Sequence, residues 1–237
     1  MNNNICIPVL GVHRSGTSLI TSILKELGVK LGRHLQPASH DNPKGFFENR
    51  LFQMKNMQLL TSNDFNIDAL DNMLGILAAY QHFKDNNSTY SVEVMPEFTK
   101  SNVWAFKDPR TVITFHFWKK VIAQDIRPLI MLRRPEEIIQ SLLNRSDFSN
   151  PEGAVECVHG LLKCLLDIKQ DNDCLTIVHN KLMSNPSESI RRINDFYNLN
   201  GNIDKALENI DESLVHCHQP IHIPIDLQKT YNEVATA

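Results

Sequence analysis

Apolar residues along this chain gather in short continuous runs that alternate with longer segments of helical periodicity. Four runs have the unbroken apolar character of strands that are buried on both faces of a sheet. These predicted strands cover residues 5–10, 103–106, 128–132 and 175–178. Pro8 has no backbone donor, so we expect the first strand to lie at an edge of the sheet or in a locally irregular ladder.

Helical periodicity fills most of the chain between these strands. Apolar residues recur at helical spacing from Leu19 to Leu27, and Gly28 is placed to end this first helix. Further helices are predicted over 51–60, over 69–83, from Pro135 onward, over 154–168, and from Asn185 through Phe196. Strands that alternate with helices predict an α/β fold, here a P-loop-like three-layer arrangement with a mostly parallel central sheet flanked by helices. Ligands of such sheets bind beyond the carboxyl ends of the strands.

Composition and charge predict one folded unit. The 237 residues are 42% hydrophobic and 22% charged, which excludes a disordered tail, a collagen-like fibre and a coiled coil. No repeat or linker divides the chain, so we predict a single domain over 1–237, with a core of about 5–200 and a C-terminal segment 201–237. The formal net charge of −3 provides no broad basic surface. This argues against nucleic acid and anionic lipid as partners, and any anion site must be local.

The cysteine pattern and the apolar runs predict a cytoplasmic protein without a membrane span. The five cysteines are odd in number and contain no CxxC pair, which favours reduced thiols. No apolar run approaches the ~20 residues of a membrane helix, and residues 1–4 differ from a signal peptide. His216, Cys217, His218 and His222 raise the question of zinc, but no second ligand pair accompanies them. We therefore expect a solvated tail there and no metal.

The junction of the first strand and the first helix carries a glycine loop, Gly11-Val12-His13-Arg14-Ser15-Gly16-Thr17-Ser18. Its backbone N–H groups would point into a tight turn beside a helix N-terminus, which predicts a phosphate-binding loop. The spacing is close to the nucleotide-kinase loop GxxxxGK[ST], but Thr17 stands at the lysine position and the cation is Arg14. ATP-dependent phosphoryl transfer is therefore disfavoured. The alternative is a P-loop kinase or nucleotide hydrolase in which Ser18 and Asp108 bind Mg²⁺.

This loop resembles the 5′-phosphosulfate loop of the sulfotransferase superfamily that uses 3′-phosphoadenosine-5′-phosphosulfate (PAPS), in the variant with arginine where cytosolic members carry lysine. The family's second signature is an arginine at a strand end with a serine eight residues later, and Arg133 and Ser141 match it. Segments 106–110 and 42–49 resemble two further blocks of bacterial sulfotransferases. The resemblance covers about 5–196. It implies sulfuryl transfer from PAPS to an acceptor hydroxyl, with 3′,5′-ADP as product and no metal.

The resemblance assigns two groups of donor-binding residues. The 5′-phosphosulfate would be bound by residues of the glycine loop, namely His13, Arg14, Ser15, Gly16, Thr17 and Ser18. The 3′-phosphate would lie in a second, separate pocket at Arg133 and Ser141. Simpler roles stand beside these: helix N-capping for Thr17 and Ser18, and for Arg133 a surface ion pair with a glutamate of the next helix. Arg134 competes with Arg133, and Arg145 is placed either for phosphate or for solvent.

The resemblance also bears on the chemistry of the transfer. Arg14 and Lys107 would stabilise the charge that develops on the leaving 3′,5′-ADP, although a lysine at a strand end can also extend into water. Cytosolic sulfotransferases carry a catalytic histidine two residues after this lysine, where this chain has Pro109. The base that deprotonates the acceptor must therefore come from elsewhere.

We predict that Glu48 is this base, because its aromatic neighbours would exclude water and other sulfotransferases place a glutamate base after the first helix. A simpler role for Glu48 is that of the N-terminal acid of the next helix. His40 and Asp41, in the same loop, are the runner-up bases.

The acceptor is predicted by class, as a small molecule or a glycan that carries a hydroxyl group, and the carbohydrate reading rests on analogy. Segments 29–49 and 63–100 would shape its pocket. Asp108 and Arg110 would either contact it or pair with each other. A third hypothesis is a non-catalytic PAPS-binding module that has lost its base. The sequence carries no signal for the oligomeric state.

Overall fold

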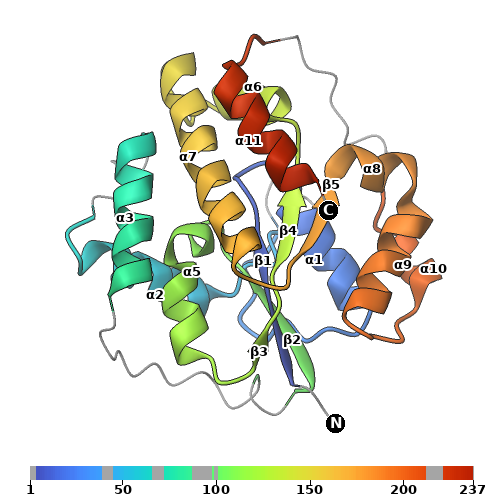
Figure 1. The fold of residues 1–237 in the computed structure, drawn as a ribbon. Helices are drawn as coiled ribbons and strands as arrows, with labels where there is room; N and C mark the ends of the chain where they lie inside the picture. The colour runs from blue at the N-terminus through green and yellow to red at the C-terminus, as the bar shows by residue number, and fades with distance from the viewer. Residues whose placement is uncertain are drawn as a thin grey trace.

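The computed structural model describes residues 4–38, 45–65, 72–86, 98, 101–211 and 221–236. In them the chain forms an α/β fold, with a parallel sheet between two groups of helices (Figure 1). The strands are β1 (Ile5–Leu10), β2 (Val103–Lys107), β3 (Asp125–Ile126), β4 (Leu129–Leu132) and β5 (Leu175–Val178). The predicted α/β architecture with a parallel central sheet is confirmed, and the short β3 is an addition to it.

The sheet has the strand order β2-β1-β4-β5, and β3 pairs with β1 next to β4; every pair is parallel. β1 is therefore central, and an edge position for Pro8 is wrong. The expected irregular ladder is confirmed, because β1 pairs with β3 at Ile5 and Cys6 and with β4 only from Val9 onward. On its other side Pro8 pairs regularly with Phe106. The missing donor thus coincides with a break in one ladder.

The helices are α1 (Thr17–Glu26), α2 (Arg50–Thr61), α3 (Met73–Asp85), α5 (Thr111–Val121), α6 (Pro135–Asn144), α7 (Pro151–Gln170), α8 (His179–Ser184), α9 (Pro186–Phe196), α10 (Ile203–Leu207) and α11 (Ile225–Ala235). Four of them, α5, α8, α10 and α11, lie where no helix was predicted. In α5 every residue from Thr111 through Trp118 is buried. A helix that is buried on all sides has no polar face, so it lacks the periodicity that would mark it in the sequence.

Side chains alternate between the two faces of the sheet and feed two separate cores. Along β1, Cys6 and Leu10 contribute to the core beneath α2, α3, α5, α6, α7 and α11. Ile5, Ile7 and Val9 contribute to the core beneath α1, α9 and α10. Figure 1 shows these two helix groups on opposite sides of the strands.

The C-terminal segment contributes to the first of these cores. Leu227 and Val234 of α11 are fully buried in it, and Lys169 of α7 donates to the Val234 carbonyl across 2.8 Å. This part of the segment is therefore folded against the domain. None of the helices in the described part of the chain combines the length and the apolar character that a membrane crossing requires.

Candidate active site

Four neighbouring strands deliver charged or polar residues to the carboxyl edge of the sheet. The glycine loop follows β1, Lys107 ends β2, Arg133 follows β4 and His179 follows β5. Because all of these strands are parallel, their carboxyl ends meet at the same edge. The fold therefore brings together the loop, the lysine and the arginine that were predicted as site residues.

The glycine loop turns sharply at two left-handed residues. Arg14 has φ 68° and Gly16, the N-cap of α1, has φ 94°. At Gly11 the loop leaves no room for a side chain, because a Cβ there would lie 2.6 Å from Ser15 Oγ and 2.7 Å from the Met131 carbonyl oxygen. Left-handed backbone beside right-handed residues directs successive N–H groups to one side, which is the geometry of an anion-binding nest. The N-cap is Gly16, so the N-capping role considered for Thr17 and Ser18 is wrong.

Several donors of this loop have no acceptor within the described residues. Ser15 is 1% exposed, and its buried hydroxyl has no hydrogen-bond partner among them. The backbone N–H groups of Gly16 and Thr17 likewise have no acceptor in the described part of the chain. Buried polar groups are almost always satisfied in folded proteins. Unsatisfied donors at a helix N-terminus are therefore suited to an anionic ligand.

The two predicted donor pockets are in direct contact, which corrects the expectation that they lie apart. Arg14 Nε donates to Ser141 Oγ across 2.9 Å, and Arg133 Nη1 donates to the Arg14 carbonyl across 3.2 Å. The reason is the strand order, because β1 and β4 are neighbours and the segments after them share one edge. Arg133 also pairs with Glu137, with Nε and Oε2 at 2.7 Å, so the simpler ion pair is present as well.

Lys107 and Glu48 form a buried ion pair beside the glycine loop. Lys107 Nζ lies 2.5 Å from Glu48 Oε1, 3.3 Å from the Phe46 carbonyl and 3.4 Å from Ser18 Oγ. The lysine is 3% exposed and the glutamate 7%, so the alternative of a solvated strand-end lysine is wrong. Asn49, not Glu48, caps α2.

The Lys107 ammonium group also bears on the kinase alternative. That alternative requires Ser18 and Asp108 to bind Mg²⁺ together. Ser18 Oγ instead lies beside the positive charge of Lys107 and donates to the Phe46 carbonyl. Asp108 accepts hydrogen bonds from the Arg110 backbone and from Asn56. A cation already lies next to the hydroxyl, which disfavours a magnesium site there.

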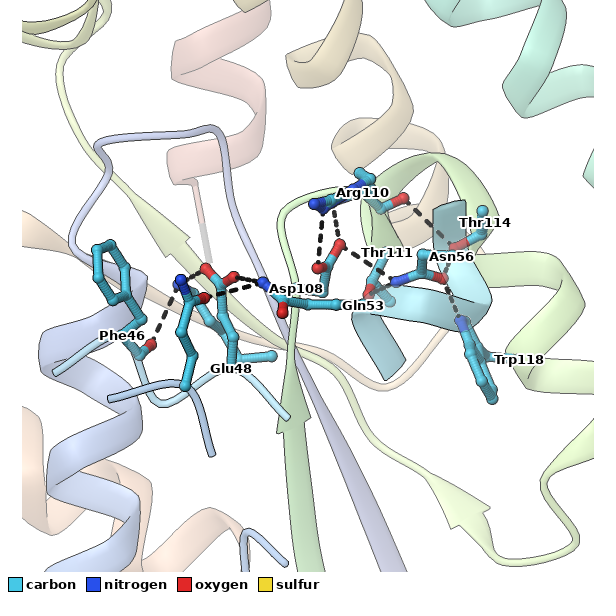
Figure 2. A network of polar contacts seen from close by, with 11 residues as sticks. Phe46, Glu48, Gln53, Asn56, Asp108, Arg110, Thr111, Thr114 and Trp118 are labelled. Atoms are coloured by element: carbon cyan, nitrogen blue, oxygen red, sulfur yellow. Dashed lines mark hydrogen bonds and ion pairs between the residues drawn. The ribbon is translucent and has the colours of Figure 1, made fainter. Parts of the chain in front are cut away.

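Asp108 and Arg110 pair with each other, at 3.2 Å between Nη1 and Oδ2. Burial raises the pKa of Asp108, and the Arg110 charge opposes that shift. Asn56 of α2 donates to Asp108 Oδ1 and accepts from Trp118 Nε1 of α5 across 2.7 Å. Figure 2 shows this network beside that of Glu48. Sequence reasoning missed Asn56, although a lone amide on the apolar face of a predicted helix was a usable signal.

Two histidines lie at the carboxyl edge of the sheet, and both have lowered pKa values. His179 is half-buried, and burial, followed by the Arg133 charge, lowers its pKa to about 4. A Cβ at Gly16 would lie 3.0 Å from the His179 ring, so this side chain packs against the glycine loop. His13 is exposed, yet desolvation by the surrounding chain, and then nearby cations headed by Arg110, lower its pKa to about 4. Sequence reasoning missed His179, although it directly follows a predicted strand.

The remaining candidates take peripheral places or lie outside the described residues. Arg134 is exposed as the N-cap of α6, and Arg145 is exposed with Nε 3.6 Å from Asp147. His40 and Asp41, and three of the four residues considered for zinc (His216, Cys217 and His218), lie outside the described residues. Within the described ranges no three metal-ligating side chains come together.

Comparisons with known proteins identify the fold. No family model and no curated protein sequence matches the chain. Among solved structures, it resembles the sulfotransferase domain of the Synechococcus PCC 7002 olefin synthase, with a TM-score of 0.60 and 12% identity over 100% of this chain and 96% of that one. It also resembles the sulfotransferase domain of the curacin biosynthetic pathway, with a TM-score of 0.58 and 15% identity over 100% and 99%. The chain therefore has the fold of these sulfotransferase domains.

Proposed function

We propose that this protein is a sulfotransferase that moves a sulfuryl group from PAPS to a hydroxyl group of an acceptor. The observation that supports this most is the buried Lys107–Glu48 pair next to a loop of unsatisfied donors. One edge of the sheet thus presents anion-binding groups and a carboxylate within reach of each other. The fold shared with sulfotransferase domains agrees with this proposal.

The residues present fit a nucleotide that carries anionic groups at both its 5′ and its 3′ position. The Ser15 hydroxyl and the N–H groups of Gly16 and Thr17 are suited to the 5′-phosphosulfate, since none has an acceptor among the described residues. Arg133 and Ser141 both contact Arg14 and are suited to the 3′-phosphate. The direct contact between these groups favours one ligand that touches both. His13 would lie at the mouth of the loop.

The side chains of this edge can supply the chemistry that transfer requires. Bound PAPS would supply the sulfuryl group. Glu48 accepts the proton of the acceptor hydroxyl, whose oxygen bonds to sulfur as the bond from sulfur to the bridging phosphate oxygen breaks. Lys107 and Arg14 stabilise the negative charge on that oxygen as 3′,5′-ADP leaves. No step requires a metal ion, because the ammonium and guanidinium charges and the backbone N–H dipoles stabilise the developing negative charge.

The acceptor class is a small hydroxylated molecule. The two similar domains belong to an olefin synthase and to the curacin pathway, which favours such an acceptor over a polymer. A glycan acceptor stays within the proposal and is tested by including sugars in the acceptor panel below. A binding module that has lost its base is less well supported, because Glu48 is present, buried and paired with Lys107.

Titration calorimetry with 3′,5′-ADP and 5′-AMP tests the donor assignment. The protein should bind 3′,5′-ADP far more tightly than 5′-AMP, and Arg133→Ala should abolish this preference. Arg134→Ala is the matched control, because its exposed side chain lies next along the chain and should leave the preference intact. Equal affinity of the unmodified protein for the two nucleotides would refute the assignment of the 3′-phosphate site.

Transfer itself is tested with labelled PAPS and a panel of small alcohols, phenols and sugars. Glu48→Gln should abolish turnover while leaving 3′,5′-ADP affinity nearly unchanged, because glutamine cannot accept the proton. Turnover that survives in Glu48→Gln would transfer the role of base to His40 or Asp41. Donor binding without transfer to any acceptor would support the binding module instead.

A further inference from the structure

A glutamine on α2 contacts the oxygen of Glu48 that Lys107 does not reach. Gln53 Nε2 donates to Glu48 Oε2 and also to Gln36 Oε1, the latter across 2.9 Å. A carboxylate only accepts hydrogen bonds, so the nitrogen of the Gln53 amide must face Glu48. Lys107 Nζ lies 2.5 Å from the other oxygen, Oε1. Both oxygens of the carboxylate are therefore engaged, each by a different element (Figure 2).

The backbone around Glu48 is fixed by the segment that carries Gln36. Gln36 N donates to the Glu48 carbonyl across 2.7 Å, and Arg50 N donates to the His34 carbonyl across 2.9 Å. These bonds flank the antiparallel bridge between Leu35 and Asn49. Gln36 thus contacts Glu48 through its backbone and, through Gln53, also its side chain.

The helix that carries Gln53 is itself anchored. Asn56, three residues further along α2, is fully buried and accepts from Trp118 Nε1 and Thr114 Oγ1, both across 2.7 Å. Phe52, the preceding residue, stacks on Phe106 of β2 with ring centroids 4.1 Å apart. Gln53 therefore projects from a helix that is fixed to both α5 and the sheet, and it can orient another group.

We propose that Gln53 is a positioning residue, which sets the direction of the Glu48 carboxylate so that it faces the acceptor hydroxyl. This inference rests on the proposed function, in which Glu48 is the base. The last torsion of a glutamate side chain is soft, so a carboxylate bound at one oxygen only can rotate about that contact. A base displaced by about 1 Å can lose on the order of 10²-fold in rate. Gln53 prevents this rotation without touching the acceptor.

The first test compares Gln53→Met with Gln58→Met in the whole protein. Methionine keeps the length of the side chain and removes the amide. Gln58 lies on the same helix, is exposed, and its side chain accepts only from Lys55 among the described residues. Gln53→Met should lower kcat about 10- to 100-fold and leave the KM for PAPS and the affinity for 3′,5′-ADP unchanged. Gln58→Met should change none of these quantities.

The second test places a charge at position 53 and measures its effect on Glu48, an effect that a residue with a merely structural role would not have. Gln53→Glu places a second carboxylate against Glu48, and two neighbouring carboxylates resist ionising together. The acid limb of the pH profile of kcat should therefore move to higher pH, whereas Gln58→Glu should leave it in place. Normal kcat in Gln53→Met, or an identical pH profile in Gln53→Glu and Gln58→Glu, would overturn the proposal.

A measurement without turnover separates this inference from the proposed function. In protein labelled with ¹³C at glutamate carboxyl groups, the Glu48 resonance is the one that disappears in Glu48→Gln. Its titration should move to higher pH in Gln53→Glu and not in Gln58→Glu. If the unmodified protein transfers no sulfuryl group, the proposed function fails. If this resonance titrates alike in both glutamate variants, the contact between Gln53 and Glu48 fails.

Discussion

The buried pair of Lys107 and Glu48 makes a prediction about stability that does not depend on any activity. Lys107→Met removes the ammonium group and leaves the carboxylate of Glu48 in place. The Glu48 side chain is 10% exposed, and its carboxylate would retain only the hydrogen bond from Gln53 among the contacts described above. An ionised group that is buried without its partner must be desolvated without compensation.

The expected cost follows from this burial. Removal of one partner of a buried ion pair costs about 3–5 kcal/mol. For a chain of this size each kcal/mol corresponds to roughly 2–4 °C in Tm, so Lys107→Met should lower Tm by about 6–20 °C. The double variant with Glu48→Met as well should regain most of this loss, because an apolar pair of similar volume is often as stable as the buried ion pair.

The assay is urea denaturation of the unmodified protein, Lys107→Met, Glu48→Met and the double variant, which together form a double-mutant cycle. Lys229→Met is the control. Lys229 pairs with Glu233 at 3.9 Å, and the two side chains are 77% and 46% exposed. Loss of such a pair should cost no more than about 1 kcal/mol. A coupling energy between Lys107 and Glu48 of no more than about 1 kcal/mol, the range of exposed pairs, would refute the reasoning, because it would mean that the two groups are not desolvated together.

Two further predictions concern buried polar groups. Ser15→Ala should raise the free energy of unfolding by about 1 kcal/mol, because it removes a buried hydroxyl that has no partner among the described residues, and it should weaken 3′,5′-ADP binding in calorimetry. As the control, Thr176→Val removes a second such hydroxyl on β5 and should stabilise the protein without affecting 3′,5′-ADP binding. A Ser15→Ala variant that is destabilised, or that binds 3′,5′-ADP normally, would contradict this prediction. Burial, and then the Lys84 charge, lower the pKa of His116 to about 4, below the ~6.5 of an unfolded histidine. The unfolded chain then binds more protons between these values, so stability is lost as pH falls from about 6.5 toward 4. In urea titrations across this window His116→Gln should flatten the slope, and an unchanged slope would contradict the assignment.

The sheet and the glycine loop could be predicted because their signals are local. An apolar run, two glycines and a helical period are visible within a few residues of one another. The observed bounds of β1, its loop and α1 agree closely with these signals. α5 could not be predicted in the same way, because its buried surroundings remove the polar face that reveals a helix. Burial on all sides is decided by neighbours that are distant in the sequence.

The site was predictable in its parts and not in its contacts. The carboxyl ends of predicted strands indicated Lys107 and Arg133, but the pattern did not say that β4 lies beside β1. The contact of Arg14 with Ser141 depends on that strand order. Gln53 carries no signal of its own, because a glutamine on a helix is ordinarily solvated, and its role depends on the segments that bring Gln36 and Glu48 to it.

A crystal structure of the protein with 3′,5′-ADP tests the central claim most directly. We predict that the 5′-phosphate accepts hydrogen bonds of about 3 Å from the backbone of Gly16 and Thr17 and from the Ser15 hydroxyl. The 3′-phosphate should contact Arg133 and Ser141. A nucleotide that binds away from the carboxyl edge of the sheet, or that touches the loop while its 3′-phosphate faces solvent, would contradict the account.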